Sequence, residues 1–324
     1  ADGRFLMWKI TTKAIQKQPI TGTSLSGFPA AYAETQAEYM ASGKATEQEK
    51  LVAGCPEYAF NEYLQIGLEQ GLVGLALFIG WLGLLFYKGI KNKRYACCGG
   101  LMSMAIFAFS SYPLQLPEFW VVLIFLGVMS VTPDKDEIRE NQAESNGHRW
   151  GKQIFFMGIA ILGIGLFWMQ KDHYKAYQQW NKAQMFYNNK AYEAALEVYE
   201  PLYPLLKHKP EFLFEAAQSL SKTGQYEKAN EYLERAVLLS SDPMLYYVMA
   251  KNEQCLGEYR QAEKHLLHAI DILPERIYPY YLLMNLYTEP SYFQPAKLKM
   301  AIDSVLTKKP KVESSAIKEM KEKA

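Results

Sequence analysis

The sequence predicts an all-α protein in which a transmembrane helix bundle precedes a soluble solenoid of helical repeats. First, apolar residues are concentrated between about residues 66 and 170, although hydrophobic residues make up only 49% of the chain. Second, the apolar runs there have the length of bilayer-spanning helices. Third, residues 176–310 repeat with a period of 33 to 34 residues, which is typical of stacked helical pairs.

Four apolar runs suggest four membrane spans. The runs are Gly71–Tyr87, Ala96–Tyr112, Phe119–Val131 and Gln153–Met169. With flanking residues they predict spans at about 66–87, 96–112, 117–131 and 153–169, because about 17 helical residues cover roughly 26 Å. One such run could be the core helix of a globular protein, but four within about 100 residues favour a membrane domain.

Basic residues near the runs predict the orientation. Lysine and arginine follow the first run and separate the third from the fourth, whereas the break between the second and third has none. The positive-inside rule places both basic loops in the cytoplasm. Residues 1–65 and everything after residue 170 then share the opposite side of the membrane.

The C-terminal repeats resemble tetratricopeptide repeats. Small alanines recur at the repeat period, and aromatic and proline positions follow the same step. The recurring residues are Ala195, Ala229, Ala262, Ala296, Tyr192, Tyr226 and Tyr259. We expect a repeat domain over 171–310, with a degenerate last unit and a charged tail at 311–324. Such stacks commonly present a concave surface to a protein partner.

Composition excludes several other classes. The net charge is +1, from 35 basic and 34 acidic side chains, which argues against nucleic-acid binding. The cysteines Cys55, Cys97, Cys98 and Cys255 form no metal-binding pattern and are expected to be free thiols. We therefore expect neither metal nor cofactor. Because the chain starts with Ala1 and lacks a signal peptide, we also expect it to be part of a longer protein.

Residues 1–65 form the candidate site-bearing loop and resemble a known family. The segments ADGRFLMWK, P-x-x-G, GF-x-x-x-Y and FNEYLQ-x-x-x-E-x-G-x-x-GL occur in this order before and into the first apolar run. They are similar to the O-antigen ligase and polymerase superfamily of bacterial inner membranes. The resemblance covers about residues 1–131, and the repeat tail resembles a variant of that family.

The resemblance implies a metal-independent, inverting glycosyltransferase at the periplasmic face. Its donor would be a glycan on undecaprenyl diphosphate. Its acceptor would be a hydroxyl on lipid A-core, on another glycan or on a protein. The chain alone would be inactive, because half of the expected membrane bundle is absent.

Arg4 matches the family's arginine and is expected to bind the diphosphate, since a guanidinium can hold its oxygens bidentately. A solvated charge at a helix start is the alternative. The family's histidine is missing, because YAF (58–60) occupies the corresponding positions. Glu57 or Glu62 could act as a carboxylate base instead, and Tyr58 could donate a hydrogen bond. A base could also be dispensable with a diphosphate leaving group, or the protein could be inactive.

Two further residues could contact substrate. Trp8 could stack on a sugar ring, although burial in an amphipathic helix is the commoner role. Asn61 could contact substrate or cap a helix at the entrance of the first span.

A second function remains open at this point. In it, the chain is a membrane-anchored tetratricopeptide scaffold that recruits an envelope partner and whose catalytic part has decayed.

Overall fold

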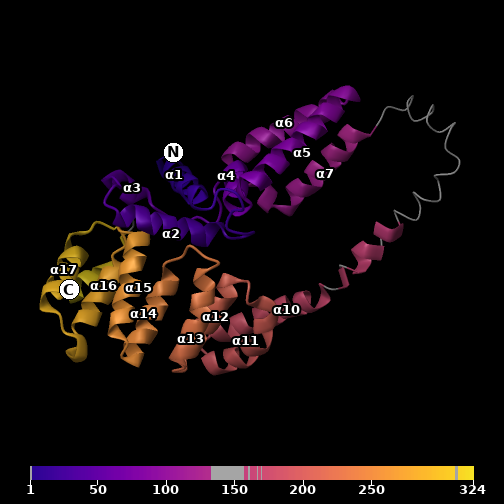
Figure 1. The fold of residues 1–324 in the computed structure, drawn as a ribbon. Coiled ribbons are helices and arrows are strands. Elements are labelled where there is room, and N and C mark those ends of the chain that lie inside the picture. Colours follow the sequence, from indigo (N-terminus) through magenta and orange to yellow (C-terminus); the bar gives the residue numbers. More distant parts are fainter. Residues whose placement is uncertain (1, 133–156, 160, 166, 169, 311–312) are drawn as a thin grey trace, which may run out of the picture.

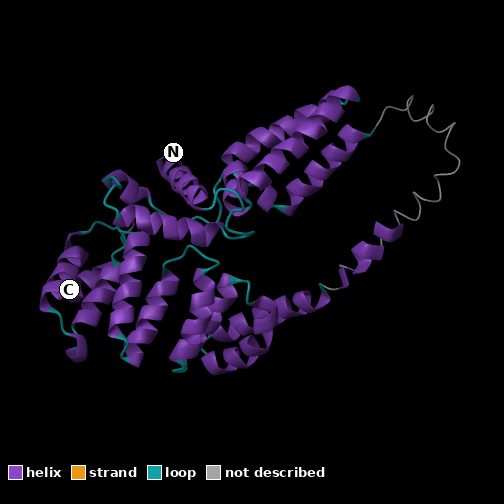
Figure 2. Ribbon diagram, in the orientation of Figure 1, coloured by secondary structure: helices purple, strands orange, loops and turns teal. Residues whose placement is uncertain are grey.

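The computed structural model describes residues 2–132, 157–159, 161–165, 167–168, 170–310 and 313–324. Every regular element in these ranges is a helix, which confirms the all-α class (Figure 2). Three parts follow one another along the chain: an N-terminal unit of short helices, a bundle of apolar helices, and a curved row of helical pairs (Figure 1). The fourth predicted span lies partly outside the described residues.

The N-terminal unit contains four helices. They are α1 (Asp2–Lys17), α2 (Phe28–Ala41), α3 (Glu47–Val52) and α4 (Glu62–Glu69). Their shared core centres on Ile10, Phe28, Tyr32 and Leu68, each no more than 2% exposed. Helix α3 begins with a capping box in which Thr46 and Glu49 satisfy each other's backbone N–H groups.

The bundle contains three apolar helices that lie side by side in Figure 1. They are α5 (Gly71–Lys91), α6 (Tyr95–Ser110) and α7 (Pro117–Val131), with the short η1 (Pro113–Gln115) between the last two. Only α5 is long and apolar enough by itself to cross a membrane among the described residues. At 21 residues it is about 31 Å long.

The bundle buries little of its apolar surface within the chain. Leu85, Leu101 and Leu123 form its small core. In contrast, Leu77 is 71% exposed and Phe125 is 61% exposed. Large contiguous apolar surfaces of this kind are typical of protein that faces lipid or another protein, not water.

The first apolar helix starts later than the sequence suggested. The motif that seemed to continue from about residue 66 into the span is interrupted at Gln70, and α4 and α5 are separate helices. The cause is Gly71, whose φ of +70° lies in the left-handed region. Here the chain turns so that Leu72 N donates to Pro19 O at 2.7 Å.

A close backbone approach fixes the loop against this turn. Thr23 N and Ser24 N donate to Leu68 O and Glu69 O at 2.9 and 3.0 Å. A Cβ on Gly71 would lie 2.0 Å from Ile20 O, and a Cβ on Gly22 would lie 2.5 Å from the backbone of Glu69. Only glycine at both positions allows this contact, which we call the glycine clamp.

The repeat domain consists of four antiparallel helical pairs. They are α10 (Lys171–Asn188) with α11 (Tyr192–Leu206), α12 (Pro210–Lys222) with α13 (Tyr226–Val237), α14 (Met244–Leu256) with α15 (Tyr259–Ile272), and α16 (Tyr278–Tyr287) with α17 (Pro295–Thr307). The helix α18 (Ser315–Lys323) follows in the charged tail, and η2 (Pro290–Tyr292) precedes α17.

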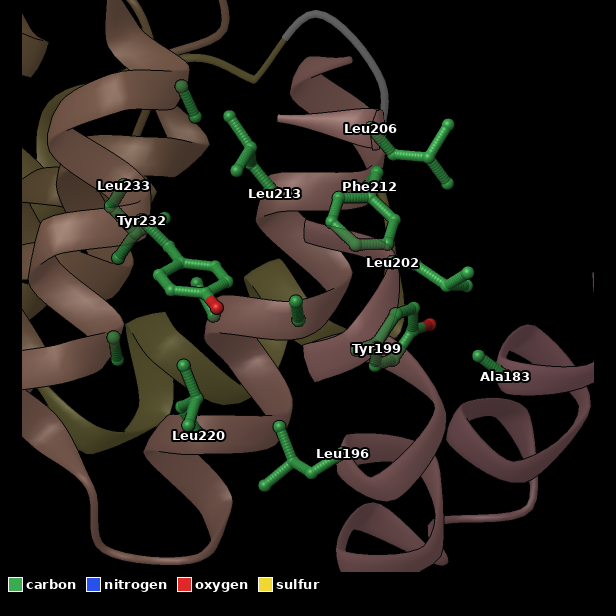
Figure 3. Packing of buried hydrophobic residues seen from close by; sticks show 14 of the residues in the cluster. Ala183, Leu196, Tyr199, Leu202, Leu206, Phe212, Leu213, Leu220, Tyr232 and Leu233 are labelled. Atoms are coloured by element: carbon green, nitrogen blue, oxygen red, sulfur yellow. The ribbon is translucent and has the colours of Figure 1, made fainter. Parts of the chain in front are cut away.

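The periodic alanines allow close helix packing. Ala195, Ala229 and Ala262 are fully buried, and bulky side chains such as Phe212 and Leu213 fill the space between the helices (Figure 3). Ala296 continues the period but is exposed, which agrees with a degenerate last unit.

The N-terminal unit rests on the repeats. Helix α2 runs across one end of α15 and packs against it, and Ile272 and Leu273 belong to the same core as Phe28 and Tyr32 (Figure 1). The fully buried Gln36 donates from Nε2 to Ile272 O at 2.9 Å, across 236 residues of sequence. The loop between α3 and α4 is also held against the repeats, because Ser241 Oγ donates to Pro56 O at 3.2 Å.

We expect Gly71→Ala to destabilise the chain by at least about 2 kcal/mol, because the new Cβ adds a clash to an unfavourable left-handed backbone. Gly80→Ala is the matched control: it lies in the same helix and meets nothing within 4 Å. Thermal unfolding in detergent measures both variants. Equal melting temperatures for the two variants would contradict the clamp.

Candidate active site

Arg4 lies where the N-terminal unit meets the bundle. Its Nη1 donates to Ser110 O, the last residue of α6, at 3.2 Å, and its guanidinium lies 5.5 Å from the centre of the Phe60 ring. The side chain is exposed. Because a guanidinium carries five N–H donors, its contacts with described residues leave donors for an anion.

An aromatic cluster extends from Arg4 to Tyr58. Tyr112 packs edge-on against Phe60 at 4.9 Å and stacks on Tyr58 at 5.1 Å between ring centres. Phe60 has a φ of +50°, which is uncommon for an aromatic residue and sets this loop at a sharp bend. The cluster thus joins the family-like motif to the segment between α6 and α7.

Glu62 is buried and bonded to that same segment. It is 1% exposed, and its Oε1 accepts a hydrogen bond from Leu114 N at 2.6 Å. Gln115 Nε2 lies 3.4 Å from Oε2. Burial, opposed in part by these hydrogen bonds, raises the pKa of Glu62 to about 7. The carboxylate therefore fixes η1 to α4, and its oxygens are less accessible to a substrate than those of an exposed acid.

Asn61 and Trp8 have structural contacts. Asn61 is 4% exposed and caps α4, because its Oδ1 accepts from Leu64 N at 3.1 Å. Trp8 donates from Nε1 to Ala59 O at 3.0 Å, and its ring packs against Phe109 at 5.6 Å. These contacts favour the capping and burial alternatives for the two residues.

Glu57 and Tyr58 line a cavity that the sequence could not reveal. The cavity has a volume of about 240 Å³ and lies between the N-terminal unit and the repeats. We call it the junction cavity. Its lining from the N-terminal unit and bundle comprises Ser26, Pro29, Glu57, Tyr58, Gln65, Glu69 and Gln115; that from the repeats comprises His208, Lys209, Pro210, Glu211, Leu239 and Ser240.

A hydrogen-bond chain shapes the floor of the junction cavity. Ala59 N donates to Gln65 Oε1 at 2.8 Å, and Gln65 Nε2 donates to Glu69 Oε1 at 2.8 Å. Both side chains are at least nine-tenths buried. Since Glu69 ends α4 just before α5, the cavity reaches the level at which the apolar bundle begins.

The repeats contribute to the junction cavity a histidine that no motif in residues 1–65 indicates. His208 lies in the turn between α11 and α12 and lines the junction cavity. The pKa of His208 is lowered, mainly by partial burial and to a smaller extent by the nearby charges of Lys209, His173 and Arg235. Its position 150 residues after Tyr58 explains why no local motif indicated it.

The six sequence-predicted residues therefore fall into two groups. Arg4, Trp8, Asn61 and Glu62 lie toward the bundle, and Glu57 and Tyr58 face the junction cavity. Tyr112 connects the groups through its contacts with Tyr58 and Phe60. No cluster of three or more metal-ligating side chains occurs among the described residues. The arrangement offers an exposed guanidinium, that of Arg4, near the apolar bundle and an exposed carboxylate, that of Glu57, in the junction cavity.

Together these features define a helical protein with an apolar bundle, a polar site at one end of it, and a repeat domain packed against that site. Residues 1–79, about a quarter of the chain, match the family model described as O-antigen ligase. Residues 188–269 match the family model of anaphase-promoting complex, cyclosome, subunit 3. The two matches confirm the composite resemblance: an O-antigen ligase-like part precedes tetratricopeptide-like repeats.

Three solved structures are similar to part of the chain. The MamA protein is 18% identical over 40% of this chain and 70% of its own, with a TM-score of 0.36. MamA 41-end from Desulfovibrio magneticus RS-1 is 17% identical over 46% and 76%, also at 0.36. The Yersinia enterocolitica chaperone SycD, in complex with a YopD peptide, is 19% identical over 39% and 90%, at 0.31. No curated protein matches the chain.

The raised pKa of Glu62 predicts a pH-dependent stability. Between about pH 4.5 and 7 the folded chain keeps the Glu62 proton that the unfolded chain has released, so stability falls as the pH rises. In this range Glu62 lowers the free energy of unfolding by at most about 1.4 kcal/mol per pH unit. Glu62→Gln keeps an oxygen for Leu114 N and should flatten this dependence.

Melting temperatures in detergent, measured at several pH values, test the Glu62 prediction. Exposed Glu227→Gln in α13 serves as the control and should retain the wild-type slope. Parallel curves for wild type and Glu62→Gln would contradict the buried proton.

Proposed function

We propose that the chain is the C-terminal part of an O-antigen ligase-like glycosyltransferase. It would transfer a glycan from undecaprenyl diphosphate to an acceptor hydroxyl at the periplasmic face of the inner membrane. The observation that carries the proposal is the position of Arg4. This residue belongs to the segment that matches the O-antigen ligase family, and its exposed guanidinium contacts the end of α6. A lipid-linked diphosphate would lie at this depth, because its lipid part occupies the bilayer.

The residues suggest a direct displacement. The acceptor oxygen forms a bond to the anomeric carbon while the bond to the diphosphate oxygen breaks, and the electron pair leaves with the diphosphate. Arg4 would stabilise the charge that develops on this leaving group. Glu57, which is exposed in the junction cavity, would take the proton of the acceptor hydroxyl. Glu62 would position the segment between α6 and α7, since both its oxygens face that segment.

Four spans fit this arrangement. Arg4 contacts the end of α6, and the basic turn between α5 and α6 lies at the other end of the bundle. The N-terminal unit and the repeats touch, so an even number of crossings must separate them. The helices α5, α6 and α7 would supply three, and the run at 153–169 the fourth. The positive-inside rule then favours a periplasmic site.

A second candidate function is a membrane-anchored scaffold. The match of residues 188–269 to a repeat-protein family favours it, because helical repeats commonly bind protein partners. In that case the N-terminal unit would be a decayed catalytic part that only holds the repeats against the membrane.

We expect Arg4→Ala, placed in the full-length protein, to reduce glycan transfer by at least about 100-fold, as loss of a charge-stabilising group does in other enzymes. Arg4→Lys should retain part of the activity, since it keeps the charge but not the planar fork. Lys13→Ala removes a cation from the same helix, where Lys13 contacts Tyr39, and should have little effect.

Profiles of lipopolysaccharide, glycolipid and glycoprotein from a complemented deletion strain measure the Arg4 variants. The class of glycan chain that disappears identifies the acceptor. Wild-type profiles for Arg4→Ala would reject the enzyme and leave the scaffold.

We also expect the two ends of the chain to lie outside the cytoplasm. A reporter fused after Ala324 should report the periplasm. In a variant whose four native cysteines are replaced by serine, a cysteine introduced at Lys91 should react only with membrane-permeant reagents. The control is a cysteine at Lys44, in the N-terminal unit, which should react with impermeant reagents. Opposite labelling at both sites would reverse the orientation.

A further inference from the structure

A second, larger cavity lies between the N-terminal unit and the repeats. Its volume is about 810 Å³, and we call it the repeat cavity. One side is the loop of Cys55 and Glu57; the other comprises the start of α12, the loop before α14, and Arg276 and Tyr278 near the start of α16. A volume of this size can hold two or three linked sugar rings or a short peptide.

The repeat cavity adjoins the junction cavity. Glu57, Pro210, Glu211 and Ser240 line both. The two form one cleft that starts beside Glu69 and Gln115, at the level of the apolar bundle, and ends beside Arg276 in the repeats. Glu57 therefore faces both the candidate reaction centre and the cavity beyond it.

The lining of the repeat cavity is rich in hydrogen-bond acceptors. Four carboxylates line it, from Glu57, Glu211, Glu215 and Asp242, against one guanidinium. Glu215 already accepts from Trp180, Gln184 and Tyr199, and Asp242 from Met244 N. Glu57 and Glu211 are exposed to the cleft. Such a lining suits a ligand that offers many donors and no negative charge.

Aromatic rings complete the lining. Phe214, Tyr247 and Tyr278 come from the first helices of three successive helical pairs, and the last two pack edge-on at 5.3 Å between ring centres. Aromatic faces beside carboxylates suit a sugar, which presents apolar C–H faces and hydroxyl edges.

Tyr247 carries an unmet hydrogen bond. Its side chain is 4% exposed, and its hydroxyl has no hydrogen-bond partner among the described residues. That hydroxyl is closed off from solvent, and so from a ligand in the cavity. The polar side chains that a ligand can reach are those of the exposed Glu57, Glu211 and Arg276.

The geometry points to a binding cleft for a neutral saccharide, the acceptor glycan of the transfer reaction, built by the repeats and the N-terminal unit together. The inference rests on the proposed function and narrows its acceptor. A phosphorylated acceptor such as lipid A-core meets four carboxylates and is disfavoured. A peptide backbone presents as many carbonyls as N–H groups, and this lining offers few donors for carbonyls.

Photo-crosslinking tests the cleft without knowledge of the ligand. Met244, 39% exposed in the lining, is replaced by p-benzoylphenylalanine in the full-length protein, and its source strain is irradiated. We expect an adduct that stains for carbohydrate after periodate oxidation. The control position is Met300, 70% exposed on α17 and outside the cavity, and should give no such adduct. A polypeptide adduct, or no adduct at Met244, would overturn the proposal.

Glu211→Gln separates binding from folding. It removes the charge of an exposed hydrogen-bond acceptor at nearly constant volume, so stability should change little, whereas saccharide affinity should fall at least fivefold. The probe is the neutral, non-phosphorylated glycan fraction of the source strain's envelope, titrated against the detergent-solubilised full-length protein. Glu227→Gln, at an exposed carboxylate of α13 outside both cavities, should bind like wild type.

Equal affinity of Glu211→Gln and wild type, or binding of only the phosphorylated fraction, would overturn the saccharide cleft. If the cleft fails this test but Arg4→Ala still abolishes transfer in the same preparations, the proposed transfer function stands and only the saccharide cleft is rejected. If Arg4→Ala transfers normally while the cleft binds the neutral fraction, the transfer function fails and saccharide binding stands.

Discussion

The close approach of Gly22 and Gly71 is the constraint on which the rest of the site depends. It lets three backbone hydrogen bonds tie the loop after α1 to the turn between α4 and α5. The loop is thereby fixed at the point where the apolar bundle begins. Without this contact α4 could continue into α5 as one rod, and α1 would keep only its side-chain contacts with the end of α6, those of Arg4 and Trp8.

Helix α2 carries that constraint to the repeats. One face of α2 packs on α1 and α4, and the other packs against α15. On this second face, Gln36 Nε2 donates to both Gly54 O and Ile272 O. Tyr32 donates to the same Gln36 side chain, so its buried amide is paired. The repeats are thus held as a wall of the site, and the two cavities lie along the line of contact.

Much of the fold could be predicted because it depends on local patterns. The alanine period predicted the helical pairs, and the apolar runs predicted the bundle. The site depends on contacts that no period encodes: Glu62 meets Leu114 across 52 residues, and His208 reaches the cavity of Tyr58. The break at Gly71 was missed because an apolar glycine-rich run hides a single left-handed residue.

The two halves of the site suit a displacement in which the partners arrive from different directions. Arg4 lies beside the apolar bundle, where a lipid-linked diphosphate would enter, and Glu57 opens to the cleft that leads into the repeats. Phe60, Tyr112 and Tyr58 lie between them as a packed aromatic cluster. Inversion requires the leaving group and the attacking oxygen on opposite faces of the anomeric carbon. The proposed displacement has its cation on the membrane side and its carboxylate on the repeat side, so the aromatic cluster would have to open for one anomeric carbon to reach both.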